Sequence, residues 1–96
     1  IRHAFRDHAY RLMVSSTKSH TGHLICAAGA IEFLFTAMTV NTACVPPTIN
    51  LNAADPDCDL DYVALDAREA SIDVALSNSF GFGGHNVSIA ARKYTG

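Results

Sequence analysis

The hydrophobic pattern divides the chain into one long apolar segment and several short ones. Positions 24–40 are apolar almost throughout, with the small residues Ala27–Ala30 in a row. This pattern predicts a helix buried on all sides, from about Thr21 to about Val40. The runs Ile72–Ser79 and Asn86–Arg92 alternate around a glycine loop, which predicts two adjacent strands.

The rest of the chain adds shorter elements. Ile1–His8 has the pattern of the last turns of a helix, and Tyr10–Ser15 (YRLMVS) predicts a short strand. Prolines 46 and 47 end any helix there, and we expect an extended, irregular stretch to about Ala67. The predicted order is βαββ, which indicates an α/β fold.

Glu32 interrupts the apolar helix. A lone carboxylate in apolar surroundings is unfavourable unless it is paired, protonated or bound to a cation. Lys18, just before the helix, is the natural partner, although most glutamates simply face solvent. The apolar run is a little shorter than the roughly 20 residues that a membrane span needs.

Composition and charge narrow the function classes. The chain has 96 residues, of which 49% are hydrophobic, and a net charge of −2, so nothing indicates binding to nucleic acid or a membrane surface. The three cysteines form no CxxC spacing and cannot all pair, which favours free thiols in a reducing compartment. One helix cannot be surrounded by three short strands, so we expect this chain to be a piece of a longer protein.

Two separate segments carry candidate chemistry. Ser15–His23 supplies a cation and an imidazole, and Asn78–Asn86 supplies a glycine loop with backbone donors. Together they could stabilise negative charge on a thioester oxygen. His23 is either a structural histidine or a neutral donor through Nε2–H, kept neutral by the start of the predicted helix. His20 and His23 form an HxxH pair without a third ligand, so a zinc site is improbable.

The glycine loop is not a dinucleotide motif. Its sequence is GFGGHN rather than GxGxxG, and a strand pattern follows it instead of a helix. Such loops are most often simple turns. Phe80 and Phe82 are unusual for a tight turn, because flanking glycines would let the Phe82 ring move and its N–H point at a ligand.

Five motifs in order carry a family resemblance: VSSTKSHTGH (14–23), AAGAIE (27–32), PPTINL (46–51), CDLDYV (58–63) and NSFGFGGHN (78–86). The chain resembles the C-terminal part of the β-ketoacyl-acyl-carrier-protein synthases of the type I/II class. The resemblance implies a thiolase-like fold, of which residues 1–96 would form the end of the second half.

The resemblance also implies residue roles. His23 matches the second catalytic histidine, which stabilises an enolate. Lys18 matches the lysine of the motif and is expected to be catalytic as well, with Glu32 as its supporting partner. Phe82 matches a gating residue whose N–H joins the oxyanion hole, and Phe80 lies in the same gate. Ser77 and Asn78, with Glu32, resemble positions near a structural monovalent cation in some members. The nucleophilic cysteine and the first histidine would lie before Ile1.

The implied activity is decarboxylative condensation of an acyl-enzyme with malonyl-acyl-carrier protein, without a cofactor. Expected partners are acyl-carrier protein and acyl and malonyl thioesters, in a cytoplasmic (or organellar) homodimer without membrane or nucleic acid. Two alternatives stay open: a polyketide ketosynthase, whose loop usually departs from NSFGFGG, and a non-catalytic interaction segment. Cys26, His20 and His85 depart from common residues of the family, which leaves the acyl-chain preference open.

Overall fold

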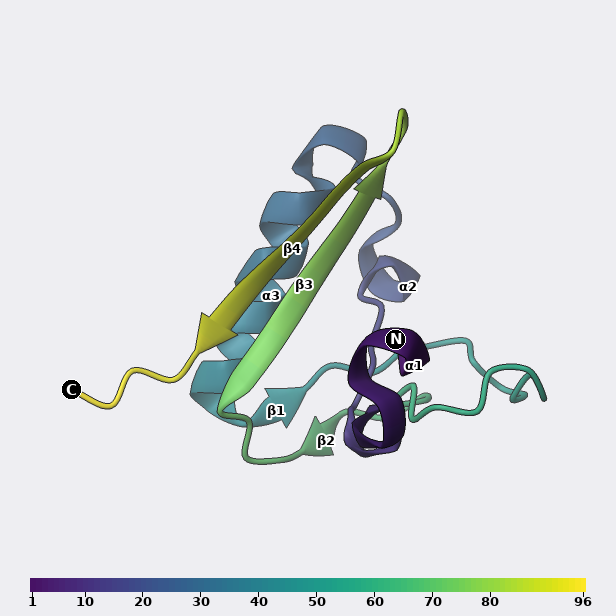
Figure 1. Cartoon of the computed structure of the whole chain (residues 1–96), viewed down its shortest axis with the longest axis horizontal. Helices are drawn as coiled ribbons and strands as arrows, with labels where there is room; N and C mark the ends of the chain where they lie inside the picture. The colour runs from purple at the N-terminus through teal and green to yellow at the C-terminus, as the bar shows by residue number, and fades with distance from the viewer.

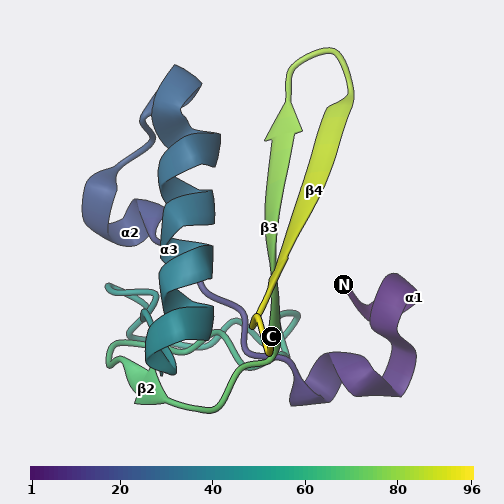
Figure 2. The same cartoon turned by 90° about the vertical axis from the view of Figure 1, so that its left-hand side faces the viewer.

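The centre of the fold is a helix packed on a β-hairpin, seen in a computed structural model that describes all 96 residues (Figure 1). Helix α3 (Ala28–Thr42) contacts β3 (Val74–Gly81) and β4 (His85–Arg92). The two strands pair antiparallel, with Val74 opposite Arg92 and Gly81 opposite His85. Figure 2 shows α3 running along one face of the hairpin.

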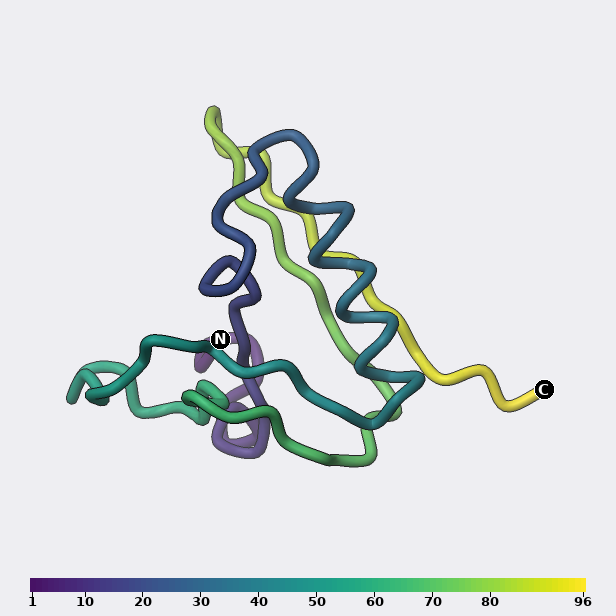
Figure 3. The backbone as a smooth tube through the Cα atoms, turned by 180° about the vertical axis from the view of Figure 1, so that it is seen from behind, coloured from purple at the N-terminus to yellow at the C-terminus, as the bar shows by residue number.

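The remaining elements are short and lie around this unit. They are α1 (Arg2–Phe5), the 3₁₀ helix η1 (Arg6–Arg11), α2 (Lys18–Thr21), the 3₁₀ helix η2 (Ile25–Ala27), β1 (Cys44–Val45) and β2 (Arg68–Glu69). Strands β1 and β2 form their own small antiparallel pair. Seen from behind, the hairpin tip and the start of α3 lie at one end of the molecule, away from the N-terminal segment (Figure 3).

The predicted hairpin is confirmed, with each strand within about two residues of its expected bounds. The tip is a three-residue loop, Phe82–Gly84, in which Gly83 and Gly84 both have φ of 79°. Glycine adopts this backbone conformation without steric cost, which explains why two glycines stand there. Gly29 permits the close packing below the tip, because an added Cβ would lie 3.3 Å from the Ser79 hydroxyl.

The predicted strand at Tyr10–Ser15 is wrong, and with it the βαββ order. Tyr10 belongs to η1, and its hydroxyl donates to Asp59 at 3.2 Å. Beyond it, only Met13 makes a parallel bridge, to Asp61. The alternating pattern fits an extended segment. A strand, however, needs a continuous series of backbone hydrogen bonds to a neighbouring segment, and here a single bridge forms.

The predicted helix start is also wrong. Helix α2 ends at Thr21, Gly22 follows with φ 72° and ψ −177°, and α3 begins only at Ala28. Glycine alone adopts that backbone conformation readily, so Gly22 stops the helix instead of opening it. His23 therefore lies in a loop, and the argument that a helix N-terminus keeps its ring neutral does not hold.

Helix α3 is not buried on all sides in this chain. Ala28, Thr39 and Val40 are buried, whereas Leu34 and Met38 on the opposite stripe are about half exposed. The stretch Ile25–Thr42 is long and apolar enough to cross a membrane, but core helices of water-soluble proteins pass the same test. A two-stranded hairpin covers only one face of a helix, so the other apolar face stays open.

The irregular region between β1 and β2 is held by polar contacts. The Arg68 guanidinium pairs with the Asp61 carboxylate, and this hydrogen bond holds the pKa of Asp61 below its ordinary value. The Asp61 carboxylate also accepts the Val63 N–H at 3.1 Å. The three cysteines, as expected, are free, and all are exposed.

We predict that the isolated 96-residue chain does not unfold cooperatively. Only 7 of 96 residues are buried, and the accessible surface is 7,210 Å², whereas a compact protein of this mass exposes about 5,400 Å². Near-ultraviolet circular dichroism and calorimetry of the purified chain test this. A sharp calorimetric transition of a monomer would contradict the prediction.

A second prediction concerns pH. The lowered pKa of Asp61 means that its carboxylate stabilises the fold above the unfolded-state pKa of about 3.9, and that this contribution disappears as pH falls through the folded-state value. In a longer protein that contains this chain, Asp61→Asn should lower the melting temperature at pH 7. The difference from the unsubstituted protein should shrink below about pH 4. Arg68→Gln should behave in the same way, and a pH-independent difference would contradict the assignment.

Candidate active site

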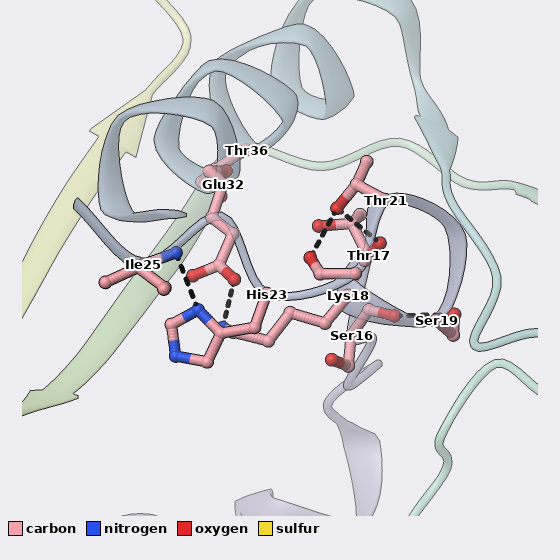
Figure 4. Close-up of polar contacts among 10 residues, drawn as sticks. Ser16, Thr17, Lys18, Ser19, Thr21, His23, Ile25, Glu32 and Thr36 are labelled. Atoms are coloured by element: carbon pink, nitrogen blue, oxygen red, sulfur yellow. Dashed lines mark hydrogen bonds and ion pairs between the residues drawn. The ribbon is translucent and has the colours of Figure 1, made fainter. Parts of the chain in front are cut away.

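An ion pair joins the first candidate segment to the long helix. The Lys18 amine, at the start of α2, contacts the Glu32 carboxylate in the second turn of α3 (Figure 4). The Glu32 side chain is only 15% exposed, and that of Lys18 is 39% exposed. The predicted pairing is therefore confirmed, and it gives the carboxylate a partner within the apolar helix.

His23 lies in the loop between these two charged residues in the sequence. Its Nδ1 accepts the backbone N–H of Ile25 at 2.9 Å (Figure 4). A ring nitrogen that accepts carries no proton, so the proton of the neutral ring lies on Nε2. The expected donor form of the imidazole is thus supported by a backbone hydrogen bond and not by a helix dipole.

The segment before His23 is fixed to the irregular region by hydroxyl groups. The Ser19 hydroxyl donates to the Ser16 carbonyl at 2.9 Å and accepts the Ile49 N–H at 3.0 Å. The Ser16 N–H donates to the Thr48 hydroxyl at 3.0 Å. These contacts anchor α2 and thereby the backbone from which Lys18 extends.

The residues suggested for a monovalent cation lie together. Glu32, Ser77 and Asn78 line one hollow of about 560 Å³ between α3, β3 and the segment that precedes α2. Ser77 is 9% exposed, and the Asn78 side-chain oxygen accepts the hydroxyl of Ser88. The chain has no group of three acidic, histidine or cysteine side chains that could hold a metal ion. A cation site at these three residues stays a prediction.

The aromatic residues of the glycine loop do not meet His23 in a shared cavity. Phe82 is fully exposed at the hairpin tip and Phe80 is 78% exposed. Neither they nor His23 line the hollow. The hairpin tip and the start of α3 do lie at the same end of the molecule (Figures 1 and 2). The predicted common pocket of His23 and Phe82 is not formed by this chain alone, because the tip packs against no other element.

Sequence reasoning missed Ile25. This β-branched residue has φ of 51°, in the left-handed region, and its N–H holds the imidazole. Ile is among the residues least suited to positive φ, so no local pattern indicates this conformation. The observation comes only from the structure.

The comparisons with known proteins identify the family. Residues 1–52 match the family described as "Beta-ketoacyl synthase, C-terminal domain". The chain belongs to the β-ketoacyl synthase family. The resemblance in the five motifs is confirmed by this match.

Curated relatives of this β-ketoacyl synthase chain are named as 3-oxoacyl-acyl-carrier-protein synthases. A "3-oxoacyl-[acyl-carrier-protein] synthase 2" of Synechocystis sp. is 57% identical over 94 residues, covering 98% of this chain. One of Coxiella burnetii is 55% identical over 86 residues, covering 90% of the chain. The chain spans only 23% and 21% of these relatives' lengths.

Solved structures show the same fold. A ketosynthase from a type II polyketide system, solved with its acyl-carrier protein and bound to a hexaketide, has a TM-score of 0.94 and 36% identity. The match covers 98% of this chain and 23% of that one. The ishigamide ketosynthase/chain length factor has a TM-score of 0.84 and 34% identity, covering 86% and 21%. The thiolase-like fold of ketosynthases is therefore confirmed.

The ion pair generates a third prediction. In a full-length synthase that contains this chain, Glu32→Gln should lower the free energy of unfolding by about 1.5–3 kcal/mol, the range of hydrogen bonds to charged groups. The effect should fall short of a fully buried pair, because water reaches the Lys18 amine. Chemical denaturation measures the loss.

Lys18→Met and the double variant complete a double-mutant cycle. If the ion pair stabilises the fold, the two single losses should not add in the double variant. Additive losses would show that Lys18 and Glu32 act independently.

Proposed function

We propose that this chain forms part of a 3-oxoacyl-acyl-carrier-protein synthase of fatty-acid elongation. The observation that carries the proposal is the His23 imidazole, oriented with Nε2–H free to donate while the Ile25 N–H occupies Nδ1. The identities of 57% and 55% to synthases of that name support it.

The proposed reaction places charge on an oxygen beside His23. Decarboxylation of a malonyl thioester breaks the bond to the carboxylate, releases carbon dioxide and leaves the electron pair on an enolate. The His23 Nε2–H would donate a hydrogen bond to that enolate oxygen, and a fixed donor stabilises charge more in the transition state than in the substrate. The enolate carbon then attacks the carbonyl of the acyl thioester held on the enzyme, which forms the new carbon–carbon bond, while the carbon–sulfur bond breaks and the cysteine leaves as its thiolate.

Lys18 and Glu32 have a supporting role in this proposal. Their ion pair connects α2 to α3 on the two sides of the His23 loop. The Lys18 charge also favours negative charge nearby. The nucleophilic cysteine and the first histidine would come from the remainder of the synthase, as the family resemblance implies, and the three cysteines of this chain are free and exposed.

We also propose the remaining features that the family implies. Phe82 would act as the gate and contribute its N–H to the oxyanion hole, with Phe80 beside it. The substrates would be acyl and malonyl thioesters delivered by acyl-carrier protein, and the ketosynthase solved with its acyl-carrier protein supports this partner. The synthase would be a homodimer in the cytoplasm or, in a eukaryote, in an organelle.

A polyketide ketosynthase is the second candidate. The solved ketosynthase with a hexaketide has a backbone nearly superposable on this chain, as its TM-score of 0.94 indicates. Its identity of 36% is lower than the 57% to the synthase of Synechocystis. The loop NSFGFGG also favours the fatty-acid enzyme. Analysis of the products that the full-length synthase forms from malonyl thioesters and a saturated acyl primer would distinguish a fatty-acid synthase from a polyketide ketosynthase.

The fourth prediction tests the role of His23. In a full-length synthase, His23→Ala should slow malonyl decarboxylation by about 10²–10³, the usual effect of losing one oxyanion donor. Transfer of the acyl group to the nucleophilic cysteine should change much less, because no enolate forms in that step. The two half-reactions are measured separately, by carbon dioxide release and by acyl-enzyme formation.

His20 offers a matched control. It lies three residues earlier, is exposed, and its ring makes a hydrogen bond with the Ser19 hydroxyl at 3.3 Å. His20→Ala should leave both half-reactions near the unsubstituted rates. Equal losses of both half-reactions in His23→Ala would indicate a structural histidine and contradict the proposed role.

A further inference from the structure

We infer that Ile25 is a positioning residue, whose backbone N–H fixes the ring orientation and tautomer of His23 while its own backbone is held in a strained left-handed conformation. This inference rests on the proposed role of His23 as an oxyanion donor. It assigns a function to a residue that no sequence motif indicates.

The first observation is the hydrogen bond itself. The Ile25 N–H reaches back two residues to His23 Nδ1 at 2.9 Å. The direction of that N–H is set by Leu24, whose φ of −78° and ψ of 12° bring the peptide plane toward the ring. The side chain of His23 thus closes a small turn onto the backbone, in the manner of an Asx-turn.

The second observation is the backbone of Ile25. Its φ of 51° lies where Cβ meets the neighbouring backbone, and a β-branched residue in that region is an outlier. The Ala27 N–H donates to the Leu24 carbonyl at 3.1 Å, so Ile25 is the second residue of a four-residue turn. Cys26, the third residue, has no positive φ, so Ile25 alone takes the positive φ of this turn, a conformation that glycine adopts without steric cost.

The two observations have one geometric explanation. The chain must first curl around His23, so that a backbone donor reaches Nδ1, and must then reverse its direction at the start of η2 to lead into α3. The positive φ at Ile25 makes this reversal immediately after the donor N–H. Strained backbone persists where the surroundings determine it and concentrates at active sites, which fits a residue adjacent to a catalytic ring.

Burial of the Ile25 side chain does not explain the strain in this chain, because the residue is 78% exposed. The ion pair of Lys18 and Glu32 joins the elements on both sides of the loop, so the chain must change direction between them, and Ile25 is the residue other than glycine that has positive φ there. The functional part of Ile25 is therefore its backbone.

The decisive experiment replaces one atom. In a full-length synthase, Ile25 is exchanged for its α-hydroxy acid by nonsense suppression, so that an ester oxygen replaces the N–H and the side chain is kept. We expect malonyl decarboxylation to slow about tenfold or more without a change in KM, because the donor ring is no longer held by a hydrogen bond. The ¹⁵N spectrum of histidine-labelled protein should show His23 with the proton on Nε2 in the unsubstituted synthase, and a tautomer mixture in the ester variant.

Controls separate this inference from a general loss of structure. The same ester exchange at Ala53, an exposed loop residue whose N–H makes no hydrogen bond, should leave the rate and spectrum unchanged. Ile25→Gly keeps the N–H and tolerates positive φ, so it should retain decarboxylation and the Nε2–H tautomer. An unchanged rate and tautomer in the Ile25 ester variant would overturn the positioning role.

A stability comparison tests the strain by itself. Glycine normally destabilises a protein relative to alanine at the same exposed site. At Ile25 the order should be reversed, with Ile25→Gly melting at a higher temperature than Ile25→Ala, because only alanine keeps a Cβ at positive φ. A lower melting temperature for Ile25→Gly than for Ile25→Ala would contradict the inference that the backbone of Ile25 is strained. If His23→Ala leaves decarboxylation unchanged while the tautomer still shifts in the ester variant, the proposed function fails and the positioning contact stands.

Discussion

The candidate site depends on how one carboxylate is accommodated in an apolar helix. Glu32 lies in α3 with 15% of its side chain exposed, and the Lys18 amine neutralises it. Without a partner, such a carboxylate would favour protonation or would force the helix to open toward water. The ion pair therefore constrains where α2 stands relative to α3, and the loop with His23 must span the two.

That loop obtains its chemistry from backbone geometry. Gly22 ends α2 with a backbone conformation that glycine alone adopts readily, and Ile25 then adopts positive φ as the first residue of η2. Between them the imidazole of His23 is held through Nδ1, which directs its remaining proton to Nε2. A histidine fixed in this way is a preorganised donor, and preorganisation is what allows a hydrogen bond to favour a transition state over a substrate.

The hairpin completes this end of the fold and leaves much apolar surface open. Gly29 lets α3 approach β3 closely, whereas Leu34 and Met38 on the outer stripe remain about half exposed. Such a surface is costly in water, at roughly 25 cal/mol for each Å² of apolar area. It is consistent with a chain that spans about 23% of its relatives' length, whose fold would be completed by further segments.

The sequence by itself determined the hairpin, the pairing of Lys18 with Glu32 and the family. These follow from short-range alternation, from glycines at a turn, and from the rule that a carboxylate in apolar surroundings needs a partner. The five motifs are specific enough to indicate the synthases by themselves, and the match over residues 1–52 agrees.

Only the tertiary structure decided the environment of His23, the absence of a strand at Tyr10–Ser15 and the separation of Phe82 from the hollow. A strand forms only when a neighbouring segment provides its backbone hydrogen bonds, and that segment can lie far away in the sequence. The local pattern therefore cannot say which segment it is. A positive φ at Ile25 opposes local preference, so propensity cannot predict it. Such conformations arise because packing on both sides of a loop fixes its ends, and the chain between them takes the one path that remains.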